Sequence, residues 1–585
     1  MNREYVYHAF TKTLCSKCSQ LVDGKIIYSD KGVFILKFCP DCGEHYEILE
    51  EDYQYHLQKY KYDKPGTKSG VQTKYNKGCP YDCGLCENHD QHTCIGLIEI
   101  TGRCNLGCPM CYANGSDANA NSDGSGIDIA NGGGANANSG GGGIDIANGI
   151  SDTNGGGDIN SDVNTNSDGS GIDIANDGGA NADSGGGGID IANGISETNG
   201  DGDINSDGVD TVNANGISDT NGRGDTNGGD DINGVDTVNA NGISTASVGD
   251  LPLRDIEKMM DFYMESEAGS AEILQISGGE PTLHKDVLAI IDMAKCKGFK
   301  YVMLNTNGIR LAEDEAFVRE LSKFRGGFEV YLQFDGLDDK AYAKLRGKNL
   351  ADTKKHAIEN LKKYNIPTTL VATIESGVND NLCGEILVFG MNTACVRGVN
   401  YQPVSYYGGV SAPMERVTLS GILNRIEKQT GKMIRTSDFI PLPCNVERVA
   451  ITYLFKDKKG FIPITRDRDL SEFKDFIGNT FVFTVEDTLK NFNDDSRIFN
   501  VCACCDLISD IKKYIPKNFT FKSKEEKMKF VDENTFRISV SSFVDQYNFD
   551  MKSMQKECVH IITPDLKRIP FSAYNMLHRK RRRVL

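Results

Sequence analysis

The pattern of apolar and polar positions divides the chain into segments with two different periodicities. Residues 96–101 (GLIEIT) form a continuous apolar run, which is typical of a buried strand. The pattern stops at Asn114 and resumes near Leu251 with an amphipathic helix over residues 251–267. Extended and helical runs then alternate, and the further predicted strands are EILQIS (272–277), YVMLNTNG (301–308), FEVYLQFDG (328–336), TTLVATIESG (368–377) and GVNYQPVS (398–405).

This alternation predicts an α/β fold. Strands that are separated by helices pair in parallel, and six such units favour a partial (β/α)6 barrel. Ligands of parallel sheets bind at the carboxyl ends of the strands. We expect a site there, because polar or cysteine-containing segments follow four of the strands: the Cys104 loop, Gly278 to Pro281, Asn305 to Gly308, and Asp335.

A segment of different composition interrupts the pattern. Residues 115–248 are dominated by Gly, Asn, Asp, Ala and Ser and contain 22 acidic residues against one basic residue. Two stretches recur 45 residues apart, since SDGSGIDIAN begins at 122 and 167 and SGGGGIDIANGIS at 139 and 184. The apolar content is too low to offset the entropy of ordering, so we predict a low-complexity disordered insert. The alternative is a calcium-binding β-roll, whose nine-residue repeat GGGGIDIAN loosely matches.

Charge and hydropathy narrow the class of protein. The chain carries a formal net charge of −18 and the insert alone −21, so the remaining residues carry +3. No run of about 18 apolar residues is present, and the N-terminus lacks the apolar core of a signal peptide. We therefore expect a cytoplasmic protein. The residues outside the insert are nearly neutral and contain no recognisable nucleic-acid-binding motif, so we predict no nucleic-acid partner.

The 19 cysteines indicate metal ligation, since cytosolic thiols are kept reduced. Cys15-x-x-Cys18 and Cys39-x-x-Cys42 flank a hairpin-like segment, KIIYSDKGVFILKF. Two such knuckles supply four thiolates in tetrahedral geometry. Zinc is the usual occupant, but a mononuclear iron needs the same four sulfurs, so the metal stays open.

The most informative cysteines follow the first strand of the barrel. Cys104, Cys108 and Cys111 have the spacing CxxxCxxC and supply three thiolates within eight residues. Three thiolates can hold three irons of a cubane cluster, which leaves the fourth iron open to a chelating ligand. A structural metal knuckle is the alternative, although the unequal spacing disfavours it.

This loop resembles the radical S-adenosylmethionine (SAM) superfamily, whose members place CxxxCxxC after the first strand. An aromatic residue stands beside the last cysteine, here Tyr112. The resemblance implies a 4Fe-4S cluster that binds SAM through its amino and carboxyl groups. It also implies reductive cleavage of SAM to a 5′-deoxyadenosyl radical, and an electron donor such as ferredoxin or flavodoxin.

The segment after the second strand strengthens the resemblance. Ser277-Gly278-Gly279-Glu280-Pro281 is similar to the family's GGEP segment, which binds the methionine amino group. A glycine pair lets backbone approach a ligand closely, and a carboxylate can accept from an ammonium group. NTNG and FDG also resemble pocket positions, although both contain common turn dipeptides. The predicted cofactor-binding residues are Tyr112, Gly278, Gly279, Glu280, Pro281, Asn305, Asn307 and Asp335.

A second cysteine run lies just upstream of the triad. Cys79, Cys83 and Cys86 repeat its spacing, and Cys94 follows. No strand and GGEP segment accompany this run, so we predict an auxiliary iron–sulfur cluster on these four cysteines rather than a second SAM site. We expect His92 to support a ligand rather than bind the metal.

The block 78–113 resembles one radical SAM subfamily, which comprises hydroxymethylpterin methylase-type proteins and the archaeal tetraether lipid synthase. The resemblance runs from the Cys15 ribbon to PFSAYN (570–575) and excludes the insert. It implies carbon–carbon coupling of two isoprenoid lipid tails, an auxiliary cluster that holds the alkyl intermediate, and a single iron in the ribbon. Methyl transfer to a pterin is the alternative within the same fold.

The C-terminal region adds candidate ligands and one departure from the subfamily. We predict a possible second auxiliary cluster from Cys444, Cys502, Cys504, Cys505 and Cys558. Ser572 stands where PFCAYN is usual, and the ligands that usually follow Cys444 are absent. A catalytically degenerate SAM-binding protein therefore stays open. The basic run 578–583 can attract anionic lipid headgroups, which would place the protein peripherally at a membrane.

The sequence predicts four segments and is compatible with three classes of function. The segments are a four-cysteine ribbon of the rubredoxin or zinc-ribbon type (1–70), an auxiliary-cluster segment (71–95), a radical SAM core (96–410) and a C-terminal domain (411–585). The leading function is a radical SAM enzyme that joins lipid tails or methylates a pterin. The alternatives are a zinc-binding scaffold and the degenerate protein.

Overall fold

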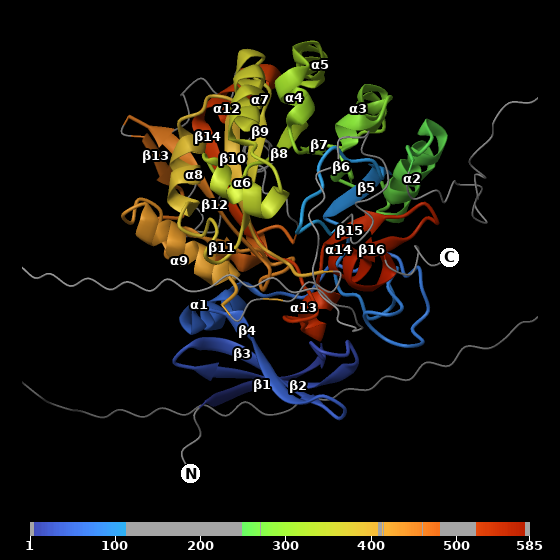
Figure 1. Cartoon of the computed structure of the whole chain (residues 1–585), viewed down its shortest axis with the longest axis vertical. Helices are drawn as coiled ribbons and strands as arrows, with labels where there is room; N and C mark the ends of the chain where they lie inside the picture. The colour runs from blue at the N-terminus through green and yellow to red at the C-terminus, as the bar shows by residue number, and fades with distance from the viewer. Residues whose placement is uncertain are drawn as a thin grey trace, which may run out of the picture. The chain divides into compact units, whose positions relative to one another are not determined.

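The computed structural model describes residues 5–112, 249–269, 271–407, 412, 415–458, 460–479 and 522–579. The predicted insert at 115–248 lies outside the described residues, and so do Cys502, Cys504 and Cys505. Figure 1 gives the labels of the helices and strands.

The N-terminal ribbon is a four-stranded antiparallel meander. Its strands pair in chain order and are β1 (Val6–Leu14), β2 (Leu21–Ser29), β3 (Gly32–Cys39) and β4 (Gly43–Glu50). The predicted hairpin is β2–β3, in which Ser29 pairs with Gly32. Helix α1 (Tyr53–Lys59) follows, and the Asp52 carboxylate caps it by accepting from two backbone N–H groups. The two Cys-x-x-Cys turns therefore lie at the β1–β2 and β3–β4 connections.

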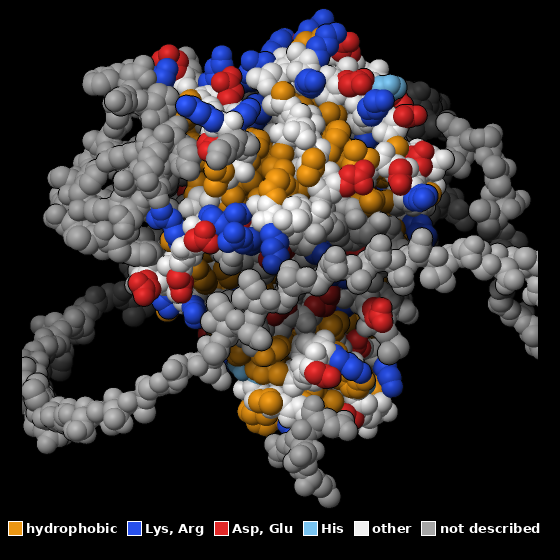
Figure 2. Space-filling view, turned by 90° about the vertical axis from the view of Figure 1, so that its left-hand side faces the viewer, with side chains coloured by type: hydrophobic (Ala, Val, Ile, Leu, Met, Phe, Trp, Pro, Cys, Tyr) orange, Lys and Arg blue, Asp and Glu red, His pale blue; other side chains and the backbone are white. Residues whose placement is uncertain are grey.

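The ribbon buries some side chains and exposes others. Val33 and Ile35 of β3 are fully buried, whereas Phe10 and Tyr46 are each 65% exposed. Figure 2 shows hydrophobic side chains on the surface of the ribbon. Such a division is typical of an antiparallel sheet with one face packed and one face solvated.

The predicted partial barrel is confirmed. Six strands, each parallel to the next, run in the order β5 to β10. They are β5 (Ile95–Thr101), β6 (Ile273–Gly278), β7 (Tyr301–Thr306), β8 (Phe328–Gln333), β9 (Thr368–Ile374) and β10 (Val396–Pro403). The helices between and after them are α2 (Leu253–Ser266), α3 (Val287–Cys296), α4 (Ile309–Glu313), α5 (Glu315–Leu321), α6 (Asp339–Arg346), α7 (Ala351–Lys363), α8 (Cys383–Met391) and α9 (Leu419–Gln429).

Alternation along the strands separates two layers of side chains. Leu274 of β6 and Leu304 of β7 pack into the large core with the helices. Their neighbours Gln275 and Asn305 point to the other face and line a cavity. Because side chains on a strand alternate between faces, the same short strands build both the core and the site.

The C-terminal region extends the barrel sheet at both edges. Strand β14 (Thr535–Ser541) pairs in parallel with β10, and β15 (Val559–Ile562) with β5. Strands β11 (Ile440–Pro441), β12 (Val449–Asp457), β13 (Gly460–Pro463) and β16 (Arg568–Pro570) complete the 12-stranded sheet of the described residues. The helices here are α12 (Lys524–Asn534), α13 (Met551–Gln555) and α14 (Phe571–Ala573). The predicted segment from 411 to 585 thus continues the sheet, while its boundary stays a prediction.

Buried polar contacts attach the ribbon to the segment after β14. The ammonium group of Lys37 donates to the carbonyl oxygens of Leu14 (2.8 Å) and Gln546 (3.0 Å). Thr13 donates from its hydroxyl to the carbonyl oxygen of Phe549 at 2.6 Å. The ribbon is therefore fixed to residues 546–549, which closely follow the cavity-lining Val544. Among the described helices, none is long and apolar enough to cross a membrane.

Candidate active site and metal centres

The loop after β5 carries the predicted triad and is fixed by side chains from other elements. Arg103 donates to Asp250 (2.7 Å) and to the carbonyl oxygen of Leu283 (2.6 Å). Within the loop, the amide of Leu106 donates to the sulfur of Cys104 at 3.4 Å. The thiols of Cys104, Cys108 and Cys111 are each half-buried. This loop thus presents three thiols on a fixed backbone.

The electrostatic environment of the triad suits a cationic metal. Burial raises the pKa of Cys104 to about 12, and the negative charges of Glu280, Cys108 and Cys111 add to the effect. Without a bound cation the Cys104 thiol stays protonated at neutral pH. A bound metal stabilises thiolates and reverses this balance, so the donor set fits an iron–sulfur cluster with three protein ligands.

The glycine pair of GGEP lies directly against the triad loop. Gly279 donates to the carbonyl oxygen of Thr101 (2.8 Å), and Glu280 to that of Arg103 (2.7 Å). A Cβ atom on Gly278 would lie 2.3 Å from the Thr101 oxygen, and one on Gly279 2.3 Å from the Arg103 oxygen. The glycines are therefore required for this backbone contact, whereas the sequence analysis attributed them to ligand approach alone.

The Glu280 carboxylate is buried and fully used within the protein. One oxygen accepts from the backbone amide and hydroxyl of Thr282 and from the hydroxyl of Thr306. The other accepts from the backbone amide of Asn307 at 2.7 Å. This geometry makes Glu280 a residue that fixes two strand-end turns, and its role as an acceptor for the SAM ammonium group stays a prediction. Pro281 begins the short 3-10 helix Pro281–Leu283 that follows.

The asparagines of NTNG have two different environments. The amide of Asn307 donates to the Asn105 side-chain oxygen at 2.7 Å, which joins the third strand end to the triad loop. Asn305 donates to Ser277 at 3.2 Å and lines the cavity. Sequence reasoning missed Asn105, because nothing but its place between two cysteines marks it.

Asp335 forms a buried ion pair with a residue that the sequence analysis also missed. Arg346 at the end of α6 donates to both Asp335 oxygens, at 2.7 and 2.9 Å, and to the Thr373 hydroxyl at 2.9 Å. Burial raises the pKa of the Cys108 thiol, the positive charge of Arg346 opposes that rise, and the Arg346 side chain lines the cavity. Asp335 is fully buried and orients Arg346, and its predicted contact with the cofactor stays a prediction.

Tyr112 closes the triad loop against the C-terminal region. Its ring packs edge-on against Phe571, with the ring centroids 5.2 Å apart, and the Arg579 guanidinium lies 5.9 Å from its centroid. Tyr112 also lines the cavity. The predicted aromatic neighbour of the cluster therefore also forms part of the cavity wall.

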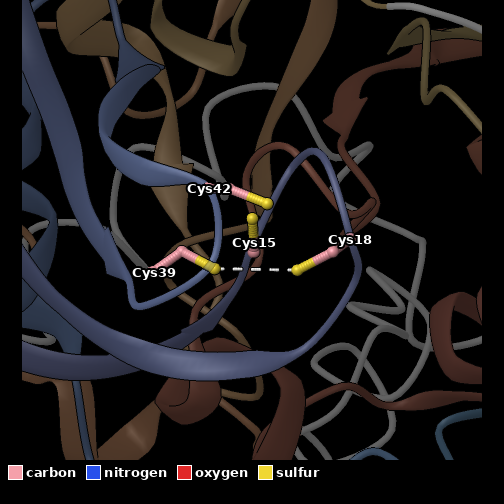
Figure 3. Close-up of side chains that lie close together, drawn as sticks. All are labelled: Cys15, Cys18, Cys39 and Cys42. Atoms are coloured by element: carbon pink, nitrogen blue, oxygen red, sulfur yellow. Dashed lines mark hydrogen bonds between the residues drawn. The ribbon is translucent and has the colours of Figure 1, made fainter.

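The four ribbon cysteines converge on one point (Figure 3). The sulfurs of Cys15, Cys18, Cys39 and Cys42 all lie within 4.8 Å of one another, and Cys18 and Cys39 are 3.6 Å apart. Metal–sulfur bonds of about 2.3 Å in a tetrahedron give sulfur separations of about 3.8 Å. Burial raises the pKa of Cys15, but the backbone amides of Cys18 and Lys17 outweigh it and the pKa falls to about 7. The site fits a single zinc or iron ion.

A second group of thiols joins cysteines that the sequence analysis assigned to different clusters. The sulfurs of Cys94, Cys444 and Cys558 lie within 4.8 Å of one another, and all three residues are buried. The parallel pairing of β5 with β15 creates this group, because the amide of Cys94 donates to the carbonyl oxygen of Cys558 at 2.9 Å. The predicted grouping of Cys94 with the Cys79 run is corrected accordingly. We name this group the sheet-edge thiols.

Cys79, Cys83 and Cys86 lie in a separate environment. Cys79 packs in a hydrophobic cluster with Phe571 and Tyr574, whereas Cys94 belongs to another cluster. The neighbouring Cys79 thiol and burial raise the pKa of Cys83. The ligand role of these three cysteines stays a prediction.

Two residues near this run have partners of their own. His89 approaches His560 with 3.1 Å between their Nε2 atoms. Ser572 donates through its amide and hydroxyl to Glu557, at 3.0 and 3.1 Å.

A cavity of about 150 Å³ connects the triad loop to the sheet-edge thiols. Met110, Tyr112 and Arg346 line it beside the triad, and Cys558 and Asn445 beside the sheet-edge thiols. Apolar side chains make up most of the wall between them: Ile95, Leu97, Leu345, Val371, Val404, Val449, Phe543, Val544, Val559 and Phe571. A substrate in this cavity would contact the triad side and the sheet-edge side at once.

The comparisons with known families agree with this site. Residues 241–389 match the model described as the radical SAM superfamily. Residues 7–51 match the HMPTM N-terminal zinc ribbon domain. The chain therefore contains a radical SAM domain, and such a domain implies a 4Fe-4S cluster and SAM as cofactors. These matches favour the enzyme over the scaffold alternative.

Similar individual proteins are known by sequence. The chain is 28% identical to the 7,8-dihydro-6-hydroxymethylpterin dimethyltransferase of Methanocaldococcus jannaschii, over 97% of this chain and 94% of that protein. It is 24% identical to the GTP 3′,8-cyclase of Thermodesulfovibrio yellowstonii, over 32% of this chain and 56% of that protein.

Solved structures show weaker similarity. Streptococcus suis SuiB bound to S-adenosylmethionine is 17% identical, with 32% of this chain and 41% of that chain covered and a TM-score of 0.27. A radical SAM methyltransferase from Sphaerobacter thermophilus is 18% identical, with 29% and 51% covered and a TM-score of 0.24. This chain thus spans about half the length of each.

Proposed function

We propose that this radical SAM enzyme forms carbon–carbon bonds at unactivated carbons of an apolar chain, as in the coupling of archaeal isoprenoid lipid tails. The observation that carries the proposal is the cavity, whose wall between the triad loop and Cys558 is mostly aliphatic and aromatic. An alkyl chain has no hydrogen-bonding groups and is held by apolar burial alone.

The triad loop supplies the place where the reaction starts. When bound, the 4Fe-4S cluster and SAM supply a 5′-deoxyadenosyl radical that abstracts hydrogen from C–H bonds. Arg346 faces this end with a guanidinium oriented by Asp335, which suits it to bind a carboxylate such as that of SAM. Asn105 and Asn307 hold the loop and the neighbouring strand end in register.

The numbers of hydrogen atoms and electrons transferred fix the stoichiometry of the proposed reaction. Joining two terminal methyl groups releases two hydrogen atoms, and each hydrogen is accepted by one 5′-deoxyadenosyl radical to give 5′-deoxyadenosine. Each SAM cleavage takes one electron, so one new bond consumes two SAM molecules and two electrons. We propose a ferredoxin or flavodoxin as the electron donor.

The other cysteine groups suit supporting metal centres. We propose that Cys94, Cys444 and Cys558 bind an auxiliary iron–sulfur cluster, since three buried thiolates form a soft donor set and Cys558 lines the cavity. A cluster there would meet the end of the substrate farthest from the triad. Cys79, Cys83 and Cys86 remain candidates for a further cluster, and the ribbon for one iron or zinc ion.

A second candidate is methyl transfer to a pterin. The name of the Methanocaldococcus jannaschii relative favours it. So do the polar side chains of the cavity, because Gln275, Asn305, Gln402 and Asn445 can pair with the ring edges of a flat heterocycle.

The experiment is an anaerobic turnover assay of the reconstituted full chain with SAM and dithionite. Lipids with deuterated terminal methyl groups should give deuterated 5′-deoxyadenosine and a coupled product, two 5′-deoxyadenosines per bond. A methylated pterin formed instead would decide for the second candidate. Failure to form any 5′-deoxyadenosine would overturn both.

Matched variants identify the cysteines responsible. C104A, C108A and C111A should each abolish 5′-deoxyadenosine formation, because each removes one iron ligand. C296A is the control, since Cys296 is exposed on α3 outside all the cysteine groups.

A further inference from the structure

The sheet-edge thiols have a hydrogen-bonded arrangement behind them that the proposed reaction does not explain. Nε2 of His92 lies 3.8 Å from the sulfur of Cys94. Nδ1 of the same ring lies 2.9 Å from the side-chain nitrogen of Gln91. Which ring nitrogen carries the proton decides whether His92 donates to the sulfur or offers it a lone pair.

The orientation of the Gln91 amide is fixed by backbone groups at both of its ends. Its oxygen accepts from the backbone amide of Thr67 at 3.2 Å, and a backbone amide can only donate. Its nitrogen donates to the backbone carbonyl of Asn479 at 3.1 Å, and a carbonyl can only accept. Gln91 is 1% exposed, so water does not compete with these bonds. The nitrogen of Gln91 therefore faces His92.

This orientation determines the tautomer of His92. The Gln91 nitrogen has two hydrogens and three possible acceptors: the Asn479 carbonyl at 3.1 Å, Nδ1 of His92 at 2.9 Å and the Cys94 sulfur at 3.8 Å. The two shorter contacts take the two hydrogens. Nδ1 must then accept, so the proton of the neutral ring lies on Nε2, which points to Cys94. His92 consequently has no lone pair to offer a metal at this site, and its N–H group donates to the sulfur.

We propose that His92 is a positioning residue that donates an N–H···S hydrogen bond to Cys94, with Gln91 fixing its tautomer, and that this bond raises the reduction potential of the auxiliary cluster. The inference rests on the proposed cluster at Cys94, Cys444 and Cys558. A hydrogen bond to a ligating sulfur withdraws charge from the cluster and stabilises its more negative, reduced state. The auxiliary cluster would then accept electrons more readily than one without the bond.

The test measures the reduction potential and the Fe–S(Cys) stretching frequency of the auxiliary cluster in the reconstituted full chain. H92F removes the donor and should lower the potential. Q91L frees the tautomer and should lower it less. H92Q restores an N–H group and should recover part of the parent potential, which a merely structural role would not explain. H356F is the control, because His356 is exposed on α7.

The outcomes separate this inference from the cluster assignment. If C558S loses iron while H92F keeps its iron and the parent potential, the hydrogen-bond inference is overturned and the cluster stands. If C558S keeps all its iron and the parent potential, the cluster assignment fails, and the inference with it. A lowered potential in H92F with partial recovery in H92Q supports both.

Discussion

Arg346 and Asp335 form a two-point ion pair next to the triad, with Nε 2.7 Å from Oδ2 and Nη2 2.9 Å from Oδ1. The Asp335 carboxylate is fully buried, and the Arg346 side chain is 14% exposed. Such a pair orients the guanidinium toward Cys108 and the cavity. Removal of one partner leaves the other charged, buried and unpaired, which strongly lowers the stability of the protein.

Substitution of Arg346 therefore tests both stability and SAM cleavage. We expect R346Q to lower the free energy of unfolding by about 3 kcal/mol, because Asp335 is left unpaired. It should also slow 5′-deoxyadenosine formation at least tenfold. Thermal unfolding and a SAM cleavage assay measure the two effects. The surface pair of Arg435 and Asp467 supplies the control, since R435Q should change unfolding by about 0.5 kcal/mol or less. Equal effects of the two substitutions would contradict this account.

The contact between Asn105 and Asn307 should couple the triad loop to the third strand end. We expect N105A and N307A to be non-additive, with a coupling energy of about 1 kcal/mol in a double-mutant cycle. Chemical denaturation of the four proteins measures it. SAM affinity should fall in both single variants, since each releases the loop. A coupling energy of zero would show that the 2.7 Å contact does not hold the loop.

The glycine pair of GGEP should tolerate no side chain. G278A places a Cβ atom 2.3 Å from the carbonyl oxygen of Thr101 at a φ of +138°, so clash and backbone strain add. We expect a loss of about 2 to 3 kcal/mol in stability and loss of SAM cleavage. G70A is the control, because nothing lies within 4 Å of its added Cβ atom. A G278A protein as stable as G70A would refute the close backbone contact.

Removal of the ribbon metal should loosen the segment that lines the cavity. Lys37 and Thr13 of the ribbon hold residues 546–549, close to Phe543 and Val544 of the cavity wall. We expect C18S to lose one metal ion per chain and to speed hydrogen exchange in residues 543–550. Metal analysis and exchange mass spectrometry measure these changes. Unchanged exchange in this segment despite metal loss would mean that the ribbon folds without its metal.

Lys354 should make stability depend on pH in the alkaline range. Burial lowers its pKa to about 7, although the charge of Asp335 opposes the shift. The unfolded chain, with a pKa near 10.5, binds more protons between pH 7 and 10 than the folded chain. Stability contributed by this site is therefore smallest below pH 7 and rises with pH, by up to about 1.4 kcal/mol per pH unit. The stability advantage of K354M over the parent should shrink from pH 7 to 10. A constant difference across this range would argue against a depressed pKa.

Local sequence patterns were sufficient to predict the six barrel strands and the four-thiolate site of the ribbon. Alternating apolar runs located all six barrel strands, and the spacing of Cys104, Cys108 and Cys111 indicated the cluster loop. The knuckles at Cys15 and Cys39 predicted the four-thiolate site, because a hairpin returns the chain to its start. In each case the signal lies within one segment or between neighbours along the chain.

Only the three-dimensional structure shows which distant segments of the chain meet. The sheet-edge thiols arise because β15 pairs in parallel with β5, which brings Cys558 to Cys94, and no local spacing records that pairing. Likewise, Arg346 meets Asp335 through the packing of α6, and Gln91 sets the tautomer of His92 through the backbone of Thr67 and Asn479. A ligand set depends on which strands become neighbours, and that choice is made by burial across the whole sheet.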